Sequence, residues 1–306
     1  MNKSNISPTH TDPIKRKVLM IIHDPIIADQ KLHDVFNWND PHELAKEYIR
    51  DIYECSFGVA QYEVVERIEV DGFPVKVDGF SYTAESFLRA WRSRSGFHVP
   101  DAVDYYALLE EFDLINKVDS GTIDEVWLFA FPYAGYYESI MGGPGAFWCN
   151  APPLTETAYC HRRFVLMGFN YERGVGEMLE DLGHRAESML ARVFRGIPDA
   201  ENLWERFTRY DLAYPGLAEV GNVHFAPNSE RDYDWGNLRV VPSKCDDWYD
   251  FPNFSGEMRQ VNSEEWGGGD IRSHHRWWFR HFPHGPGKSN GISHNWWEYV
   301  LDPGRV

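Results

Sequence analysis

The chain has 306 residues, a length that suggests one large domain or two smaller ones. It is 43% hydrophobic and 25% charged, an ordinary balance for a globular protein with a sizeable core. The formal net charge of −17 disfavours nucleic acid and anionic membranes as partners and is compatible with bound cations.

The N-terminal region carries no targeting signal in the sequence as given. Residues 1–16 are polar and predict a disordered tail, and the short apolar segment after them lacks the features of a signal peptide. No apolar run approaches the roughly 18 residues of a membrane-spanning helix. We therefore expect a cytoplasmic protein, with a secreted mature form as the alternative. The cysteines are expected to be free and buried, although Cys149 and Cys160 would be able to pair in an oxidising compartment.

Strand and helix patterns alternate along the first 200 residues. The continuously apolar run at 17–22 predicts a buried strand, and Asp40 followed by Pro41 predicts a helix from there to about Cys55. Further strands are predicted at 62–70, 75–77, 123–131, 164–169 and 222–225, and helices at 83–92, 103–116 and 199–210. This alternation predicts an α/β fold with a mostly parallel or mixed sheet and flanking helices.

The composition changes after residue 228. Residues 229–306 are rich in Trp, His, Gly and Asn, and only 273–281 and 295–301 have helical patterns. The segment has few apolar aliphatic residues. We therefore predict an α/β core domain at 17–228 and an aromatic-rich, irregular C-terminal region at 229–306 that packs on this core.

Polar residues follow the predicted strands at the points where their apolar runs stop. These are His23 with Asp24, Tyr133 to Glu138, Asn170 to Glu172, and His224 to Asn228. In parallel sheets, ligands bind beyond the carboxyl ends of the strands. If these ends converge, Glu138 and Glu172 are candidate catalytic carboxylates, and Tyr133, Tyr136 and Asn170 are candidate substrate contacts. Ordinary turns are the alternative explanation for each end taken alone.

A helix is predicted after Gly174, with one apolar stripe along its length. The opposite face carries acids and a histidine, namely Glu177, Glu180, Asp181, His184 and Glu187. Such a face supplies metal ligands and acid–base groups at helical spacing. The alternative is a solvated outer face that is supported by ion pairs such as Asp181 with Arg185.

The stretch EDLGH, from Glu180 to His184, resembles the HExxH helix of zincin metallopeptidases, with Glu in place of the first His and Asp in place of the Glu. The resemblance covers five residues and implies a metal-dependent hydrolase, with a zincin-like α+β fold as an alternative. It implies that Glu180 and His184 bind zinc and that Asp181 is the general base. We add Glu187 and His224 as candidate ligands and Glu177 as a second candidate base, with calcium as the alternative metal.

Two further functions are compatible with the sequence. Glycosidases use a carboxylate pair without metal, for which Glu138, Glu172 and Glu177 are candidates, and aromatic rings such as Trp277 and Trp278 would bind the sugar. A non-catalytic carbohydrate-binding protein would use the same rings. Peptide or carbohydrate is the expected substrate, and the oligomeric state stays open. No nucleotide cofactor is expected, because the glycine-rich loop at 142–145 lacks the Lys-Ser/Thr pair of a phosphate-binding loop.

Overall fold

The computed structural model describes residues 12–306 and divides the chain into two compact units. The sheet unit consists of Lys15–Arg50 and Tyr62–Met189. The aromatic unit consists of Asp51–Gln61 and Leu190–Val306, with residues 12–14. The main division therefore falls near residue 190, whereas the sequence analysis placed it after residue 228.

The predicted N-terminal tail falls mostly on residues 1–11, which lie outside the described residues. The end of that predicted tail, from Ile14 on, belongs to the first strand. The strand is longer than its apolar run because its first residues are only partly buried.

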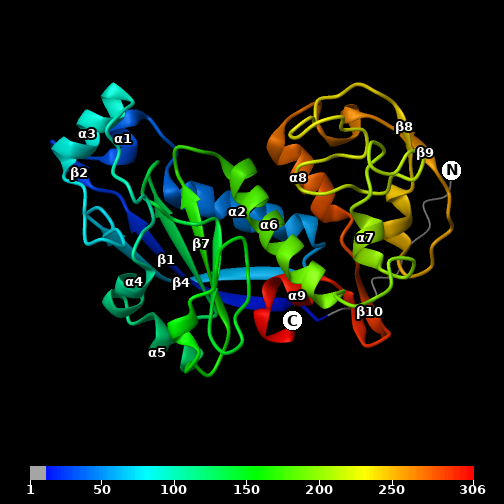
Figure 1. The fold of residues 1–306 in the computed structure, drawn as a ribbon, viewed down its shortest axis with the longest axis horizontal. Helices are drawn as coiled ribbons and strands as arrows, with labels where there is room; N and C mark the ends of the chain where they lie inside the picture. Colours follow the sequence, from blue (N-terminus) through cyan, green and yellow to red (C-terminus); the bar gives the residue numbers. More distant parts are fainter. Residues whose placement is uncertain (1–11) are drawn as a thin grey trace. The chain divides into compact units, whose positions relative to one another are not determined.

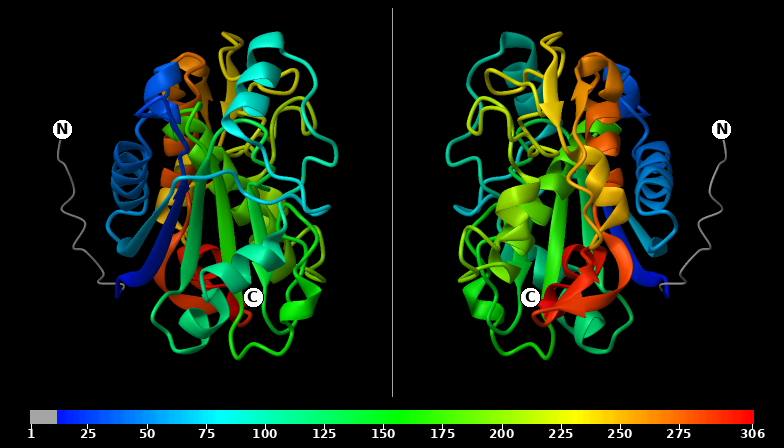
Figure 2. Two further views of the ribbon diagram at one scale, coloured as in Figure 1. Left: turned by 90° about the vertical axis from the view of Figure 1, so that its left-hand side faces the viewer. Right: turned by 90° about the vertical axis from the view of Figure 1, so that its right-hand side faces the viewer.

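The sheet unit has an α/β fold, as predicted. Its sheet is mostly parallel and has the strand order β4-β1-β5-β7-β6 (Figures 1 and 2). β5 pairs in parallel with both β1 and β7, while β6 runs antiparallel to β7 at the edge. The strands are β1 (Ile14–His23), β4 (Ala60–Val70), β5 (Glu125–Ala130), β6 (Ser139–Gly142) and β7 (Phe164–Asn170).

Helices and short elements surround this sheet. They are β2 (Ile26–Ile27), β3 (Gln30–Lys31), α1 (Leu32–Phe36), α2 (Pro41–Cys55), α3 (Ala84–Ser93), α4 (Tyr105–Glu111), α5 (Leu114–Asp119), the 3-10 turn η1 (Thr155–Thr157) and α6 (Val175–Val193). α4 and α5 pack with residues such as Leu19 and Leu128 in one apolar cluster. On the other face, Tyr48 of α2 contacts the rings of Trp127 and Phe169 at centroid distances of 5.2 and 5.3 Å. Burial on both faces explains the continuously apolar strands.

Three local predictions differ from the structure. The predicted helix at 103–116 is broken into α4 and α5, because Asp113 takes a left-handed conformation with φ of 52°. The predicted strand at 75–77 is reduced to an isolated bridge between Lys76 and Val103. The predicted strand at 222–225 is irregular. The edge strand β6 was not predicted, because its four residues are too few to show a period.

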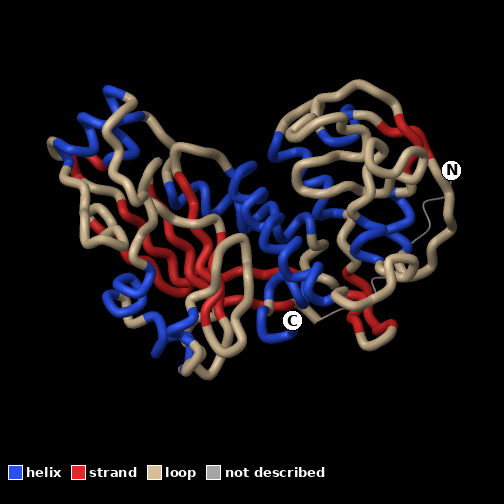
Figure 3. The backbone as a smooth tube through the Cα atoms, viewed as in Figure 1, coloured by secondary structure: helices blue, strands red, loops and turns tan. Residues whose placement is uncertain are grey.

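The aromatic unit consists largely of loops (Figure 3). Its helices are α7 (Leu203–Phe207), α8 (Ile271–Arg280) and α9 (Trp297–Leu301), and its 3-10 turns are η2 (Cys245–Asp250), η3 (Ser263–Trp266) and η4 (Pro303–Arg305). Two antiparallel pairs complete it, β8 (Val241–Ser243) with β9 (Arg259–Val261) and β10 (His284–Ser289) with β11 (Ile292–Asn295).

Aromatic rings form the core of this unit. Phe207 lies 5.0 Å from Trp248, 5.3 Å from Phe282 and 5.5 Å from Trp296 between ring centroids. Aromatic side chains bury about 150–250 Å² each, so the scarcity of Leu, Ile and Val does not prevent a core here. α7 belongs to this core, which is why the unit begins near residue 190 and not at 229.

Among the described residues, none of the helices has the length and apolar character required to cross a membrane.

Candidate functional site

The polar ends of β1, β5 and β7 meet at one edge of the sheet, as the sequence analysis expected if they converge. The Tyr136 hydroxyl lies 2.7 Å from Nδ1 of His23, and the Tyr171 hydroxyl donates to Asp24 at 3.4 Å. The other oxygen of Asp24 lies 2.6 Å from Nδ1 of His33. His23 and Asp24 are buried. These side chains bond mainly to one another, which gives the edge a rigid polar network.

His23 makes the stability of the protein depend on pH. Burial lowers the pKa of its imidazole to about 4, from an ordinary value of about 6.5. Below pH 6.5 the imidazole binds a proton in the unfolded chain but not in the folded chain. The contribution of His23 to the free energy of unfolding is therefore present above pH 6.5 and is lost as the pH falls to 4. We expect His23 to account for about 3 kcal/mol of acid destabilisation.

Denaturant unfolding at several pH values between 7 and 4 tests this expectation. The loss of stability on acidification should be about 3 kcal/mol smaller in a His23→Gln variant than in the wild type. His42→Gln, at a more exposed histidine, serves as the control and should follow the wild-type curve. Parallel curves for the wild type and His23→Gln would show that His23 is not the titrating group.

α6 starts directly after the turn that follows β7. The backbone N–H of Gly174 donates to the Glu177 carboxylate at 3.1 Å, so Glu177 satisfies an amide at the N-terminus of this helix. A carboxylate in the first turn also interacts favourably with the helix dipole. Glu177, a predicted catalytic residue, therefore has a local structural role.

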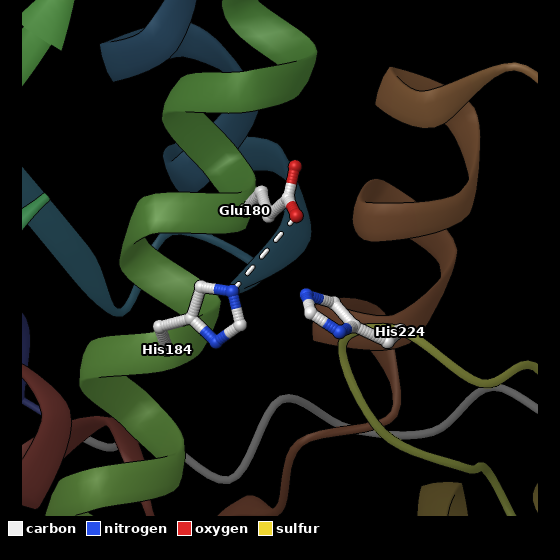
Figure 4. A group of neighbouring side chains, drawn as sticks. All are labelled: Glu180, His184 and His224. Carbon is white, nitrogen blue, oxygen red and sulfur yellow. Dashed lines mark ion pairs between the residues drawn. The ribbon is translucent and has the colours of Figure 1, made fainter. Parts of the chain in front are cut away.

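His184 lies at the centre of a group of carboxylates in the sheet unit. Its Nδ1 is 3.2 Å from Glu187, and its Nε2 is 3.8 Å from Glu180 and 4.0 Å from Glu138. Glu180 and His184 project from the same side of α6 (Figure 4), as their spacing of four residues predicts. The imidazole is only 18% exposed, so this part of the helix face is not a solvated surface.

The charges of these carboxylates control the proton on His184. Burial by itself lowers the pKa of the imidazole, but the interactions with Glu180 and Glu187 and the charge of Glu138 outweigh burial and raise the pKa to about 10. For Asp181, burial and the neighbouring carboxylates both act in the same direction. Burial, followed by the charges of Glu138 and Glu180, raises the pKa of its carboxyl group well above the ordinary value.

Two parts of this surrounding were missed by the sequence analysis. Asn150 donates a short hydrogen bond to Glu138 and fixes its carboxylate. Arg185, predicted to pair with Asp181 at the surface, is fully buried and lies 2.8 Å from Glu125 at the start of β5. Trp127 also donates to the Glu125 carboxylate, at 2.8 Å. No sequence signal indicated these pairs, because their members are far apart in the chain or belong to a loop.

The remaining candidates of the sheet unit lie in turns. Asn170 accepts a hydrogen bond from the backbone N–H of Glu172 at 2.9 Å, and the Glu172 side chain is exposed. The exposed ring of Tyr133 stacks on Phe97 with a centroid distance of 3.5 Å. Of the predicted strand-end carboxylates, Glu138 and not Glu172 is found beside His184.

Three candidates belong to the aromatic unit. Trp278 is fully buried, and its indole N–H donates to the carbonyl of Gly221 at 2.9 Å. It is therefore a core residue, and neither face of its ring is accessible to a ligand. Trp277 is half-buried against His281, with ring centroids 4.3 Å apart. Nδ1 of His224 lies 3.0 Å from Asp232, and the role of His224 as a third metal ligand stays a prediction. All four cysteines are free, as expected.

Comparison with known proteins gives no relative from which a function would follow. The chain matches no protein-family model, and none of the curated proteins matches its sequence.

Proposed function

We propose that the α6 face binds a divalent cation and that the protein is a metal-dependent hydrolase. One observation carries this proposal: oxygens of three glutamates, Glu138, Glu180 and Glu187, lie within 4.0 Å of the nitrogens of the His184 ring. Three carboxylates exceed the charge of one protonated imidazole. A dication in place of that proton would add one positive charge and so reduce the excess negative charge of the group.

The side chains fit zinc better than calcium. Zinc accepts imidazole nitrogen together with carboxylate oxygen, whereas calcium prefers a shell made of oxygens only. The proton on His184 competes with the cation. With a pKa of about 10, removing that proton at pH 7 costs about 4 kcal/mol. Cation affinity should therefore rise with pH, and binding should release the proton of His184.

The cation would lower the pKa of a bound water molecule and polarise the bond to be cleaved. It would also lower the pKa of the nearby Asp181 carboxyl group, because a positive charge favours the ionised form. Asp181 would then take up a proton from water, the role that the resemblance to the zincin helix implies. Glu138, held by Asn150, is placed to orient the water or the substrate. Peptides and glycans are the proposed substrate classes.

Zinc binding and hydrolysis test the proposal together. Chelator-treated wild-type protein should bind zinc, release protons on binding and unfold at a higher thermal midpoint. An E180Q/H184Q double variant should bind one zinc equivalent fewer than the wild type. Ser188→Ala, on the same helix, is the matched control and should bind as the wild type does. An H224A variant tests the predicted third ligand. Two results together would exclude a cation on α6. The thermal midpoint would not change after addition of zinc or calcium, and the wild type and the double variant would bind the same number of metal ions.

A second function, glycan hydrolysis without metal, is favoured by the raised pKa of the Asp181 carboxyl group. Burial and the charges of neighbouring carboxylates raise this pKa, and glycosidases use an acid whose pKa is raised by its surroundings. Two exposed aromatic residues are close to these groups in the sequence. Tyr137 directly precedes Glu138, and Trp148 lies shortly before Asn150, which donates to Glu138. In this case glycan turnover would persist in chelator and fall at least about 100-fold in D181N and E138Q. Saturable glycan binding without turnover would instead indicate a binding protein.

A further inference from the structure

A second group of metal-ligating side chains lies within the aromatic unit, independent of the α6 face. Cys245 and Asp246 are the first two residues of η2, and His281 follows the last residue of α8. Each residue offers one possible ligand atom, and these three atoms all lie within 4.8 Å of one another. Cys245 and His281 are buried, and Asp246 is exposed. Sulfur and nitrogen therefore lie inside the unit, with the carboxylate at the surface.

The hydrogen bonding of His281 leaves one of its ring nitrogens available as a ligand. Its Nδ1 lies 2.8 Å from the carbonyl oxygen of Trp277, and because a carbonyl only accepts, Nδ1 carries the proton. The other nitrogen, Nε2, is buried, has no hydrogen-bond partner and holds a lone pair. A buried acceptor without a partner costs about 1–3 kcal/mol. Histidines that bind metals commonly donate their second nitrogen to a backbone carbonyl, as His281 does.

We propose that Cys245, Asp246 and His281 bind a zinc ion, with a fourth position open to solvent. Zinc takes thiolate, imidazole and carboxylate ligands in tetrahedral sites, and three protein ligands with one open position are typical of zinc that also binds water or a small molecule. Calcium and magnesium do not suit this group, because they prefer oxygen ligands.

The surrounding charges match a bound dication. Arg259 donates to both oxygens of Asp246, at 2.6 and 2.9 Å, and also pairs with Glu265. Each carboxylate oxygen of Asp246 keeps a further lone pair for a metal. A dication, the Cys245 thiolate, the Asp246 and Glu265 carboxylates and the Arg259 guanidinium together carry no net charge.

Cys245 must lose its proton to bind. In the structure its Sγ donates to Asp246 at 3.6 Å. A cation between these groups takes over the interaction and displaces the proton into solvent. Zinc binding should therefore become stronger as the pH rises.

An opening to solvent adjoins the group. A pocket of about 190 Å³ is lined by Asp246 and by further polar residues that include Asp247, Asp250, Glu257 and Arg259. Its acidic walls favour the entry of a cation, and Asp246 belongs to both the pocket and the ligand group. The pocket thus supplies an entry path for the ion and room for a ligand at the open position.

Cobalt substitution of the full chain distinguishes this site from the α6 face, because only this group contains a sulfur. Chelator-treated wild-type protein loaded with Co²⁺ should show a thiolate-to-cobalt charge-transfer absorption that added zinc abolishes. Cys245→Ser should lose the absorption and one metal equivalent. Cys160→Ser, at another buried cysteine, is the matched control and should keep both.

His281→Gln provides a second variant that leaves the sulfur in place. It should bind cobalt at least about 10-fold more weakly than the wild type, with circular dichroism confirming that it is folded. The proposal is overturned if the folded wild type shows no cobalt–thiolate absorption, or if that absorption persists in Cys245→Ser. Metal loss restricted to E180Q/H184Q with no thiolate absorption would place the ion on α6 alone.

Discussion

Replacing Arg185 by leucine is expected to lower the free energy of unfolding by about 3–5 kcal/mol. Arg185 and Glu125 are both almost completely buried, with their charged atoms 2.8 Å apart. Removing the guanidinium leaves the Glu125 carboxylate inside the sheet unit without a compensating charge. Trp127 still donates to it, but one neutral donor does not replace the lost cation. Chemical denaturation monitored by circular dichroism measures the effect.

Two comparisons separate the buried charge from the loss of packing. An E125Q/R185L double variant should recover a large part of the stability, because glutamine is neutral and keeps an acceptor for Trp127. Arg192→Leu, at an exposed arginine of the same helix, should change stability by less than about 0.5 kcal/mol. Equal destabilisation by the single and double variants would show that packing, and not charge, is responsible.

The parts of the fold that were predictable from sequence are those that local patterns determine. The run from Phe164 to Phe169 is continuously apolar, and both faces of β7 are covered. The helix predicted to begin after Asp40 is present, and the N–H of His42 donates to the Asp40 carboxylate at 2.7 Å. The break at Asp113 was not predictable in the same way. A left-handed residue between two helical segments depends on the packing of both segments, and Asp carries only a weak preference for that conformation.

The same limit explains the candidate site. The placement of Glu180 and Glu187 beside His184 follows from helical spacing, so sequence alone predicts it. Glu138 was a strand-end candidate, but its approach to His184 depends on the edge strand β6, which brings the backbone of Glu138 against Gly168 at 3.1 Å. The pairing of Arg185 with Glu125 depends on sheet register and helix position together. Interactions of this kind have no local signature in the chain.

Replacing Trp278 by alanine should destabilise the aromatic unit by about 3–5 kcal/mol. The indole is fully buried, and its ring centroid lies 4.7 Å from Phe282 and 5.9 Å from Phe207. Truncation leaves a large cavity among rings that cannot collapse without losing their edge-to-face contacts. It also removes the donor to the carbonyl of Gly221, which then lies buried with one partner fewer. Trp278→Phe keeps an aromatic ring and should cost less.

The effect should be local, because the aromatic unit has its own core. In a hydrogen-exchange measurement on Trp278→Ala, amides of α8 and α9 should exchange faster than in the wild type, while amides of β5 and β7 should change less. Trp148→Ala, at a tryptophan that is 59% exposed, is the matched control and should alter stability by less than about 0.5 kcal/mol. If Trp278→Ala were as mild as Trp148→Ala, the ring would be replaceable in its surroundings.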